Sequence, residues 1–332
     1  MKIGILGAGV MGNAHITGFR SMKKQNATYT GIYDIDKSRC SEFAGKYQLK
    51  AYESLEELLS DKEITIIDLC LPSFLHEEYA VKIAQAGKHM IIEKPVAFTV
   101  EAAKNIYRAA HGNNVRVMVA QVIRFWPEYV KIKEICDSGA LGRIITAYAA
   151  RLGQMTTWSD WYQYPEKSGE TLMNLTLHDI DFLHYLLGKS GSVYSAGNKD
   201  EQGNYSDVMN IFTFGNGTNA MVDGSMSMTP GYPFTMRLRV LGTEGTLEFS
   251  YISGENIGPE STSSLMWYKE GGKGIKVEVE DYDPYGREIQ YFAECVENRT
   301  DPVIVSEQSV IDVLTSVVAA KKSLLTGEIQ YL

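Results

Sequence analysis

The sequence predicts an α/β protein of two domains: a doubly wound parallel sheet, then a large, mostly antiparallel open sheet with helices on one face. Short apolar strands alternate with helical patterns over the first third of the 332 residues. Hairpin-like strand pairs separated by glycine turns follow in the second half. The length also suits two domains, because one domain averages roughly 150 residues. We place the domains at residues 1–122 and 123–332.

Five short apolar runs predict the strands of the first domain: Lys2–Leu6, Thr28–Tyr33, Thr65–Leu69, His89–Ile92 and Val115–Val119. The segments between them have helical patterns: Val10–Met22, Lys37–Tyr47, Leu55–Leu59, Glu77–Ala86 and Val100–Ala110. Continuous Ile, Val and Leu runs separated by helices are typical of a parallel sheet that is covered on both faces.

Three strand pairs predict the second sheet: Asp207–Phe214 with Thr218–Met228, Phe234–Leu241 with Thr246–Ser250, and Leu265–Lys269 with Ile275–Glu280. The Asn-Gly step between the first two strands is a strong hairpin signal. Periodic apolar residues predict helices over Thr171–Leu187, Tyr285–Val296 and Ser309–Leu325. Gly188 and Gly327 suit the ends of the first and last of these helices.

Composition and charge exclude several classes of function. The net charge of −9 argues against a nucleic-acid-binding protein, which normally presents a basic face. No uninterrupted apolar run reaches the roughly 18 residues of a membrane span, and the N-terminus lacks a secretory pattern. Four scattered cysteines favour reduced thiols and a cytoplasmic protein, with neither a disulfide nor a metal site: Cys40, Cys70, Cys136 and Cys295.

A glycine-rich loop follows the first predicted strand and opens the first predicted helix. Gly7, Gly9 and Gly12 match the G-x-G-x-x-G pattern, with Val10 and Met11 at the start of the helix. The first glycine permits a tight turn, the second lets the backbone approach a pyrophosphate, and the third lets the helix pack closely on the strand. The N–H groups of the helix N-terminus favour an anion. In this context the motif predicts a dinucleotide-binding Rossmann domain.

An acidic residue ends the second predicted strand, about twenty residues after the loop. In dinucleotide-binding domains such a residue accepts hydrogen bonds from the ribose hydroxyls, which assigns Asp34, with the neighbouring Ile35, to the cofactor. A 2′-phosphate would meet both Asp34 and Asp36, so NAD is favoured over NADP. Lys37 and Arg39 lie close enough in the sequence to keep NADP as an alternative.

Several longer motifs strongly resemble the glucose–fructose oxidoreductase/inositol dehydrogenase/rhizopine-catabolism (Gfo/Idh/MocA) family. They are Leu71-Pro72-Ser73-Phe74-Leu75-His76, the stretch 87–95 ending in Glu93-Lys94-Pro95, Arg124-Phe125-Trp126-Pro127, Trp158-x-x-Trp161, and the stretch 168–181. The resemblance covers essentially the whole chain and implies an NAD(P)-dependent oxidoreductase in which Lys94 is the catalytic lysine. It further assigns to the cofactor site Leu71, Pro72, Ser73, His76, Glu93, Lys94, Gln121 and Trp161. It also implies a cis Lys94–Pro95 bond.

The spacing of Asn174 and His178 places both residues on one face of the predicted helix. Sugar and polyol dehydrogenases of the family carry Asp-x-x-x-His at this point, so Asn174 is a departure from the pattern. His178 is the natural general base, because the unperturbed pKa of histidine lies near neutrality. Lys94 would place an ammonium beside the developing alkoxide. We therefore assign Lys94, His178 and Asn174 as the catalytic residues.

Substrate contacts are predicted from position and from the resemblance. His15 either contacts substrate or fills a crevice, and Arg124 either recognises a carboxylate or phosphate of the substrate or braces the domain interface. Trp158 suits a sugar surface, although tryptophans often serve as core. Tyr285 follows the family's habit of placing a tyrosine near the last long helix, and Asn174 and His178 complete the set. His76 has a second possible role, as a cap of the helix that follows it.

The sequence thus predicts an NAD-dependent oxidoreductase that acts on a secondary alcohol or carbonyl of a sugar, cyclic polyol or derivative. One alternative is an NAD-dependent glycoside hydrolase on the same scaffold, in which the sugar is oxidised only transiently. The other, kept open by Asn174, is a non-catalytic protein that binds a dinucleotide or sugar. We expect a small-molecule substrate, no nucleic-acid or membrane partner, and a homodimer or homotetramer.

Overall fold

The computed structural model describes residues 1–155, 161, 164–254, 261–269 and 271–332. Two compact units make up the chain. The first contains Met1–Trp126 and Asp281–Ile311, and the second contains Pro127–Glu280 and Asp312–Leu332. The chain therefore enters each unit twice, and a late segment returns to the unit that holds the N-terminus. The boundary between residues 122 and 123 stays a prediction.

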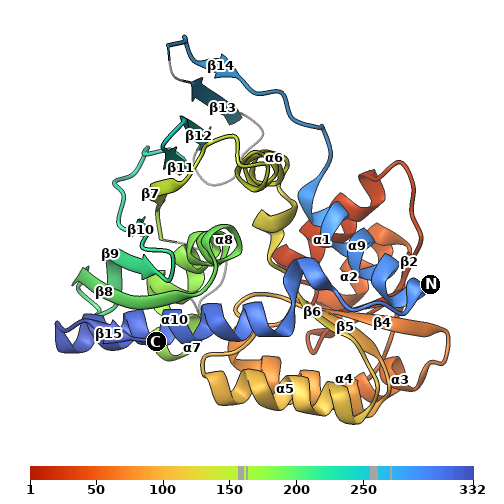
Figure 1. Cartoon of the computed structure of the whole chain (residues 1–332). Helices are drawn as coiled ribbons and strands as arrows, with labels where there is room; N and C mark the ends of the chain where they lie inside the picture. Colours follow the sequence, from red (N-terminus) through yellow and green to blue (C-terminus); the bar gives the residue numbers. More distant parts are fainter. Residues whose placement is uncertain (156–160, 162–163, 255–260, 270) are drawn as a thin grey trace. The chain divides into compact units, whose positions relative to one another are not determined.

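A parallel sheet of six strands forms the centre of the first unit, in the order β3-β2-β1-β4-β5-β6 (Figure 1). The strands are β1 Lys2–Leu6, β2 Thr28–Tyr33, β3 Lys50–Ala51, β4 Ile64–Leu69, β5 His89–Ile92 and β6 Val117–Val119. All five pairings between neighbours are parallel, and the central strands are almost entirely buried. The predicted doubly wound sheet is confirmed, and the two-residue β3 is an edge strand that the sequence did not reveal.

Helices cover both faces of this sheet. They are α1 Val10–Ser21, α2 Lys37–Tyr47, α3 Leu55–Ser60, α4 His76–Gln85, α5 Val100–Gly112 and α9 Pro284–Asn298. Figure 1 shows α1 and α9 on one side of the sheet and α4 and α5 on the other. Polar side chains cap four of these helices, because each accepts a hydrogen bond from a backbone N–H in the first turn: Asp36, Ser54, Thr99 and Asp283.

The second unit contains a nine-stranded sheet in the order β14-β13-β12-β11-β7-β10-β9-β8-β15. The strands are β7 Ile144–Leu152, β8 Ser190–Lys199, β9 Tyr205–Phe214, β10 Asn219–Ser225, β11 Phe234–Gly242, β12 Gly245–Ser253, β13 Ser261–Lys269, β14 Ile275–Lys276 and β15 Gln330–Tyr331. The three predicted strand pairs are antiparallel, as expected. One central pair, β7 with β10, is parallel, so the sheet is mostly antiparallel and the predicted fold class is confirmed.

Two predictions for this sheet are corrected by the structure. The last strand was expected over Ile275–Glu280, but only Ile275–Lys276 pairs, at the sheet edge. The strands β7, β8 and β15 were not predicted. In β8 the weak apolar pattern explains this, because the strand buries serines at 190 and 195 against a helix instead of large apolar side chains.

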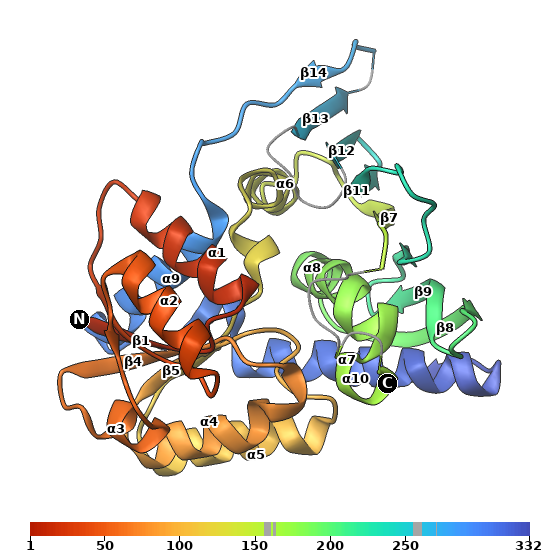
Figure 2. The same ribbon diagram turned by 180° about the vertical axis from the view of Figure 1, so that it is seen from behind.

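The helices α6 Pro127–Asp137 and α8 Leu177–Leu187 lie on the same side of the second sheet (Figures 1 and 2). Tyr129 of α6 joins them, because its ring packs edge-on against both Phe182 of α8 and Phe249 of β12, with centroids 4.7 and 5.0 Å away. The helix predicted over Thr171–Leu187 is not regular: a π-helical turn, Leu172–Thr176, precedes α8. A four-residue helix, α7 Pro165–Ser168, comes before this turn.

The last long helix, α10 Glu307–Thr326, is strongly apolar. Together with the preceding turn it forms one stretch, Val303–Thr326, that meets the length and composition expected of a membrane span. Its side chains, however, pack as in a core helix: Val313, Val317 and Ala320 are buried. The hydroxyl of Ser316 bonds to that of Ser190, and Ser323 Oγ accepts the N–H of Ser195 in β8, so the helix is tied to the second sheet.

Candidate active site

The glycine loop has the form that a pyrophosphate requires. Gly7 has a φ of +107°, and a Cβ there would lie 2.6 Å from the carbonyl oxygen of Cys70. A Cβ at Gly12 would lie 2.6 Å from the oxygen of Gly7, so this glycine lets α1 approach β1. Gly9 faces open space and caps α1 without a side-chain hydrogen bond, unlike the four helices with polar caps. The exposed N-terminus at Val10 and Met11 therefore fits an anionic cofactor group.

Asp34 joins the end of β2 to this loop. Its carboxylate accepts the N–H of Ala8 at 2.8 Å and the N–H of Asp36 at 2.9 Å. The guanidinium of Arg39 also donates to it at 2.8 Å, and the charge pair raises the pKa of Arg39. The neighbouring Ile35 is 82% exposed, as expected of a residue that faces a ligand or solvent. A carboxylate and an arginine therefore share the position that a cofactor ribose would occupy.

His76 bridges two of the loops assigned to the cofactor. Its ring is buried, with Nδ1 2.8 Å from the carbonyl oxygen of Pro95 and Nε2 2.8 Å from that of Leu71. Burial lowers the pKa of His76. His76 is the first residue of α4, so its ring holds two backbone segments together and does not act as a side-chain cap. Pro72 and the buried Ser73 lie in the segment that it fixes.

The ends of β5 and β6 carry the remaining first-unit residues of the predicted site. Lys94 lies two residues after β5, is half-buried, and precedes a cis peptide bond to Pro95, as the resemblance implied. Gln121 follows β6, and its buried side-chain oxygen has no hydrogen-bond partner within the described ranges. Such an orphaned acceptor fits a ligand that donates an N–H or O–H, such as the carboxamide of nicotinamide. Arg124 instead donates to the carbonyl of Ile304 and the hydroxyl of Ser309, at 2.6 and 3.2 Å.

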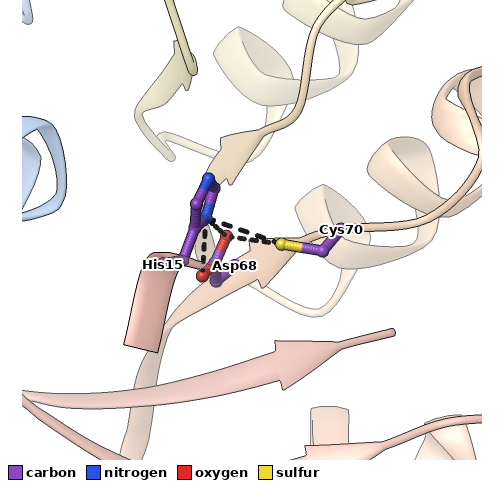
Figure 3. Close-up of side chains that lie close together, drawn as sticks. All are labelled: His15, Asp68 and Cys70. Atoms are coloured by element: carbon purple, nitrogen blue, oxygen red, sulfur yellow. Dashed lines mark hydrogen bonds and ion pairs between the residues drawn. The ribbon is translucent and has the colours of Figure 1, made fainter. Parts of the chain in front are cut away.

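A buried ionic cluster lies beneath the glycine loop, where α1 meets β4 (Figure 3). His15 is fully buried; its Nδ1 lies 3.0 Å from Asp68 and 3.5 Å from the sulfur of Cys70, and its Nε2 lies 2.9 Å from Glu93. Both ring nitrogens of His15 are thus engaged inside the unit, and its contact with substrate stays a prediction. The Tyr285 ring lies 5.8 Å from that of His15.

The same cluster contains a residue that the sequence did not single out. Glu288 of α9 is fully buried, with its carboxyl 3.8 Å from Nε2 of His15. Burial raises the pKa of Glu288 well above its usual value, and the nearby carboxylates add to this. Burial would lower the pKa of His15, but the charges of Asp68 and Cys70 and the hydrogen bonds to them together outweigh burial and raise that pKa well above its usual value. No pattern in the sequence pairs residues 15, 68, 93 and 288; only the tertiary fold brings them together.

The second unit positions Asn174 and His178 through the π-helical turn. Asn174 lies within the turn and His178 follows it in the first turn of α8; both are half-buried. Turns of this kind occur frequently at functional sites. Asn174 also lines a small cavity, with Ser168, Glu170, Asn204 and Tyr205. The buried side-chain oxygen of Asn204 has no hydrogen-bond partner among the residues described.

A buried ion pair anchors the helix that carries His178. Asp179 accepts two hydrogen bonds from Arg151 of β7, at 2.8 and 3.1 Å, and both side chains are at least 95% buried. The pair fixes the rotation of α8 immediately beside His178. Trp161 is half-buried in the same unit. Trp158 lies outside the described residues.

Comparison with known proteins gives the family. Residues 1–121 match the model of an oxidoreductase family with an NAD-binding Rossmann fold, GFO_IDH_MocA. Residues 129–248 match the GFO/IDH/MocA C-terminal domain. The two matches come from one family, lie in the order of the chain, and together span most of it.

Relatives and solved structures agree over nearly the whole length. The chain is 24% identical to myo-inositol 2-dehydrogenase of Thermotoga maritima, over 98% of this chain and 96% of the relative. It is 26% identical to D-xylose 1-dehydrogenase (NADP(+)) 2 of Haloferax volcanii, over 98% of each. The fold matches that of the WlbA dehydrogenase from Bordetella pertussis, solved with NADH and UDP-GlcNAcA, with a TM-score of 0.83 at 20% identity over 100% and 98% of the two chains. The chain belongs to the Gfo/Idh/MocA family of NAD(P)-dependent oxidoreductases.

Proposed function

We propose that this protein oxidises a secondary alcohol of a sugar, cyclic polyol or derivative, or reduces the corresponding carbonyl, with NAD as the preferred cofactor. The observation that carries the proposal is the glycine loop, in which Gly7 and Gly12 permit the close backbone approaches and Gly9 leaves the N-terminus of α1 without a side-chain cap. Asp34 adds a ribose acceptor beside it. The inositol and xylose dehydrogenases among its relatives support the substrate class.

Lys94 and His178 are proposed to handle the proton. When bound, the NAD⁺ cofactor would supply the hydride acceptor. His178 takes the proton of the substrate hydroxyl while the hydride leaves the carbon that bears this hydroxyl. The ammonium of Lys94 stabilises the alkoxide that develops on the oxygen. The proposed role of Asn174 is to orient the hydroxyl through its amide, because an amide forms hydrogen bonds but does not titrate.

The remaining first-unit residues hold the cofactor in this proposal. The segment from Leu71 to Ser73, fixed by His76, forms one wall, and the side-chain oxygen of Gln121 accepts a hydrogen bond from the cofactor. Ile35, together with Trp161 from the second unit, completes the proposed contacts. Arg124, Tyr285 and Trp158 stay predictions as substrate contacts, and for His15 we develop a different role below.

A substrate panel tests this function against its two alternatives. Myo-inositol, D-xylose, glucose and an aryl glycoside are each incubated with NAD⁺ or NADP⁺, and absorbance at the NADH wavelength is followed. We expect steady NADH production with a polyol or aldose. Cleavage of the aryl glycoside without net NADH would favour the hydrolase, and ligand binding with neither reaction would favour the non-catalytic binding protein.

We also propose that the protein forms homodimers or homotetramers through the uncovered face of the second sheet. Tyr194, Met209 and Ile211 are 40, 48 and 49% exposed there. Tyr194 lies opposite Ile211 across β8 and β9, and Met209 lies opposite Ala196, so the apolar side chains are contiguous. Contiguous exposed apolar surface of this kind marks protein interfaces. The free thiols at Cys40 and Cys295 suit a cytoplasmic protein.

A further inference from the structure

We propose that the buried pair His15 and Glu288 positions Lys94 through Glu93. The inference rests on the proposed function, because it matters for turnover only if Lys94 acts in the reaction. His15 and Glu288 would be positioning residues that touch neither substrate nor cofactor. The contacts that support this role all lie within the first unit.

A path of hydrogen bonds connects His15 through Glu93 to the backbone of Lys94. One oxygen of the Glu93 carboxylate lies 2.9 Å from Nε2 of His15, and the other accepts the backbone N–H of Lys94 at 2.9 Å. The other ring nitrogen of His15 faces Asp68 at 3.0 Å, and Asp68 also accepts the hydroxyl of Tyr29 at 2.7 Å. The imidazole is therefore held at both ends, and the backbone of Lys94 is tied through Glu93 to α1 and β4.

The carboxyl groups of Glu93 and Glu288 both lie near one N–H of His15. Nε2 faces the carboxylate of Glu93 at 2.9 Å and that of Glu288 at 3.8 Å. Neither oxygen of Glu288 has a hydrogen-bond partner within the described part of the chain. Carboxylates that share a buried site cannot all be ionised, because their charges repel and each lacks water. The one without partners keeps its proton, and a neutral Glu288 leaves the N–H of His15 to Glu93.

The helices α1 and α9 cross closely where Glu288 lies beside His15. A Cβ at Gly18 of α1 would lie 2.2 Å from the Asp283 carboxylate and 2.9 Å from the backbone nitrogen of Gly286. A Cβ at Gly286 would lie 2.3 Å from the backbone oxygen of Gly18. Two glycines thus let α1 and α9 touch backbone to backbone. In this close crossing, the carboxyl of Glu288 on α9 lies 3.8 Å from Nε2 of His15 on α1.

The arrangement predicts that the backbone of Lys94 is held less firmly at alkaline pH. The titratable groups around Glu288 and His15 come from α9 itself and from four other elements. They are Tyr29 of β2, Asp68 and Cys70 at the end of β4, Glu93 after β5, Asp283 and Tyr285 at the start of α9, and His15 of α1 with Glu288 themselves. His15 is the cation among them. When alkaline pH removes the proton of Glu288, its carboxylate competes with Glu93 for that cation. The tie to the Lys94 backbone then weakens.

The test compares three variants of the full-length protein in the presence of NAD⁺ and the best substrate among myo-inositol and D-xylose. We expect His15→Gln to lower kcat at least tenfold while KM for NAD⁺ changes less than threefold. Glu288→Gln, which imitates the neutral acid, should keep kcat within threefold at pH 7 and lose part of the alkaline decline. His111→Gln is the matched control, because His111 also pairs with a carboxylate, that of Glu307, but is 69% exposed. It should leave kcat and the pH profile unchanged.

A second readout does not depend on turnover. In protein with ¹⁵N-labelled histidine, the resonance that disappears in His15→Gln should show both ring nitrogens protonated at pH 8. A neutral His15 would overturn the proposal, as would a stoichiometric metal ion lost in that variant, since a metal on Nδ1 would replace the hydrogen bond to Asp68. If Lys94→Ala abolishes turnover but both cluster variants keep wild-type kcat and pH profile, the positioning role fails alone. If Lys94→Ala keeps full turnover, the proposed function itself fails.

Discussion

At the scale of a single residue, the proposed preference for NAD rests on Asp34. Its carboxylate holds the loop nitrogen of Ala8 and at the same time holds Arg39 at 2.8 Å. An arginine that is already paired with a carboxylate is a poor partner for a 2′-phosphate, whereas the same arginine without its carboxylate would be a good one. The NADP alternative raised by the sequence therefore depends on which of the two groups Arg39 binds.

We predict that Asp34→Ser shifts the preference toward NADPH. A hydrogen bond to a charged group contributes about 1.5–3 kcal/mol, so NADH affinity should fall roughly 10- to 150-fold. Released Arg39 should at the same time strengthen NADPH binding. Fluorescence titration of both reduced cofactors measures the ratio. The double variant Asp34→Ser/Arg39→Ala should bind NADPH weakly again; if it binds NADPH as well as the single variant, Arg39 does not contact the phosphate.

The buried Glu288 also predicts how the free energy of unfolding depends on pH. The pKa of Glu288 is raised by burial, so the folded protein holds a proton that the unfolded chain releases above about pH 4.3. Where the folded state binds more protons, stability falls as pH rises, by up to about 1.4 kcal/mol per pH unit for one proton. The contribution of the Glu288 proton to the free energy of unfolding is thus fully present below about pH 4. It is lost progressively as pH rises to the pKa of Glu288 in the folded protein.

Urea unfolding at a series of pH values measures this dependence. We expect Glu288→Gln to flatten the decline between pH 5 and 8 relative to the wild type, because glutamine does not titrate. The pKa of His15, raised in the fold, acts in the same direction above about pH 6.5 and should persist in the variant. Identical slopes for the two proteins would contradict a protonated Glu288.

Among the secondary-structure elements, the π-helical turn matters most for the position of the proposed catalytic residues. It occupies Leu172–Thr176 and leads directly into α8, so its geometry sets where Asn174 and His178 lie. Gly224 of β10 makes room for it: a Cβ there would lie 2.0 Å from the Cγ2 of Thr176. The sheet and the turn therefore fit together only with a glycine at this position.

We predict that Gly224→Ala destabilises the protein and lowers kcat. An added methyl in a packed core costs about 1–3 kcal/mol, and relief of the clash would move the turn that carries Asn174. Gly191→Ala in β8 is the matched control, because a Cβ there would meet only the oxygen of Thr213 at 3.8 Å. Thermal unfolding and kcat are measured for both. Equal effects of the two substitutions would show that the contact with Thr176 does not position the turn.

Elements with a strong local signal were predictable from the sequence, and those fixed by tertiary contacts were not. The apolar strand before Gly7 and the Asn-Gly turn before Thr218 each specify their structure locally. The strand β8 depends on a distant helix that accepts its buried serines, and the π-helical turn depends on Gly224. The glycine loop and Asp34 were visible in the sequence for the same reason, whereas Glu288 reaches His15 only through the crossing of α1 and α9.

At the scale of the whole molecule, the uncovered sheet face predicts the oligomeric state. Ile211→Glu places a charge at the centre of the patch formed with Tyr194 and Met209. We expect the variant to be a monomer in light scattering after gel filtration, whereas the wild type is a dimer or tetramer, because burial of an unpaired carboxylate disfavours association. Thr213→Glu, an exposed position of the same strand, is the control. An unchanged mass for Ile211→Glu would contradict assembly through this face.

Lys94 and His178 come from different units of the chain, and the proposed chemistry requires that both act on one proton-transfer step. A double-mutant cycle measures this directly: kcat/KM for the wild type, Lys94→Ala, His178→Ala and the double variant, with NADH affinity determined for each. Each single variant should lose about 10²–10⁴-fold in kcat/KM with NADH binding retained, and the double variant should lose much less than the product of the two. Single variants with near-wild-type turnover, or losses that multiply as for independent residues, would contradict a shared catalytic step.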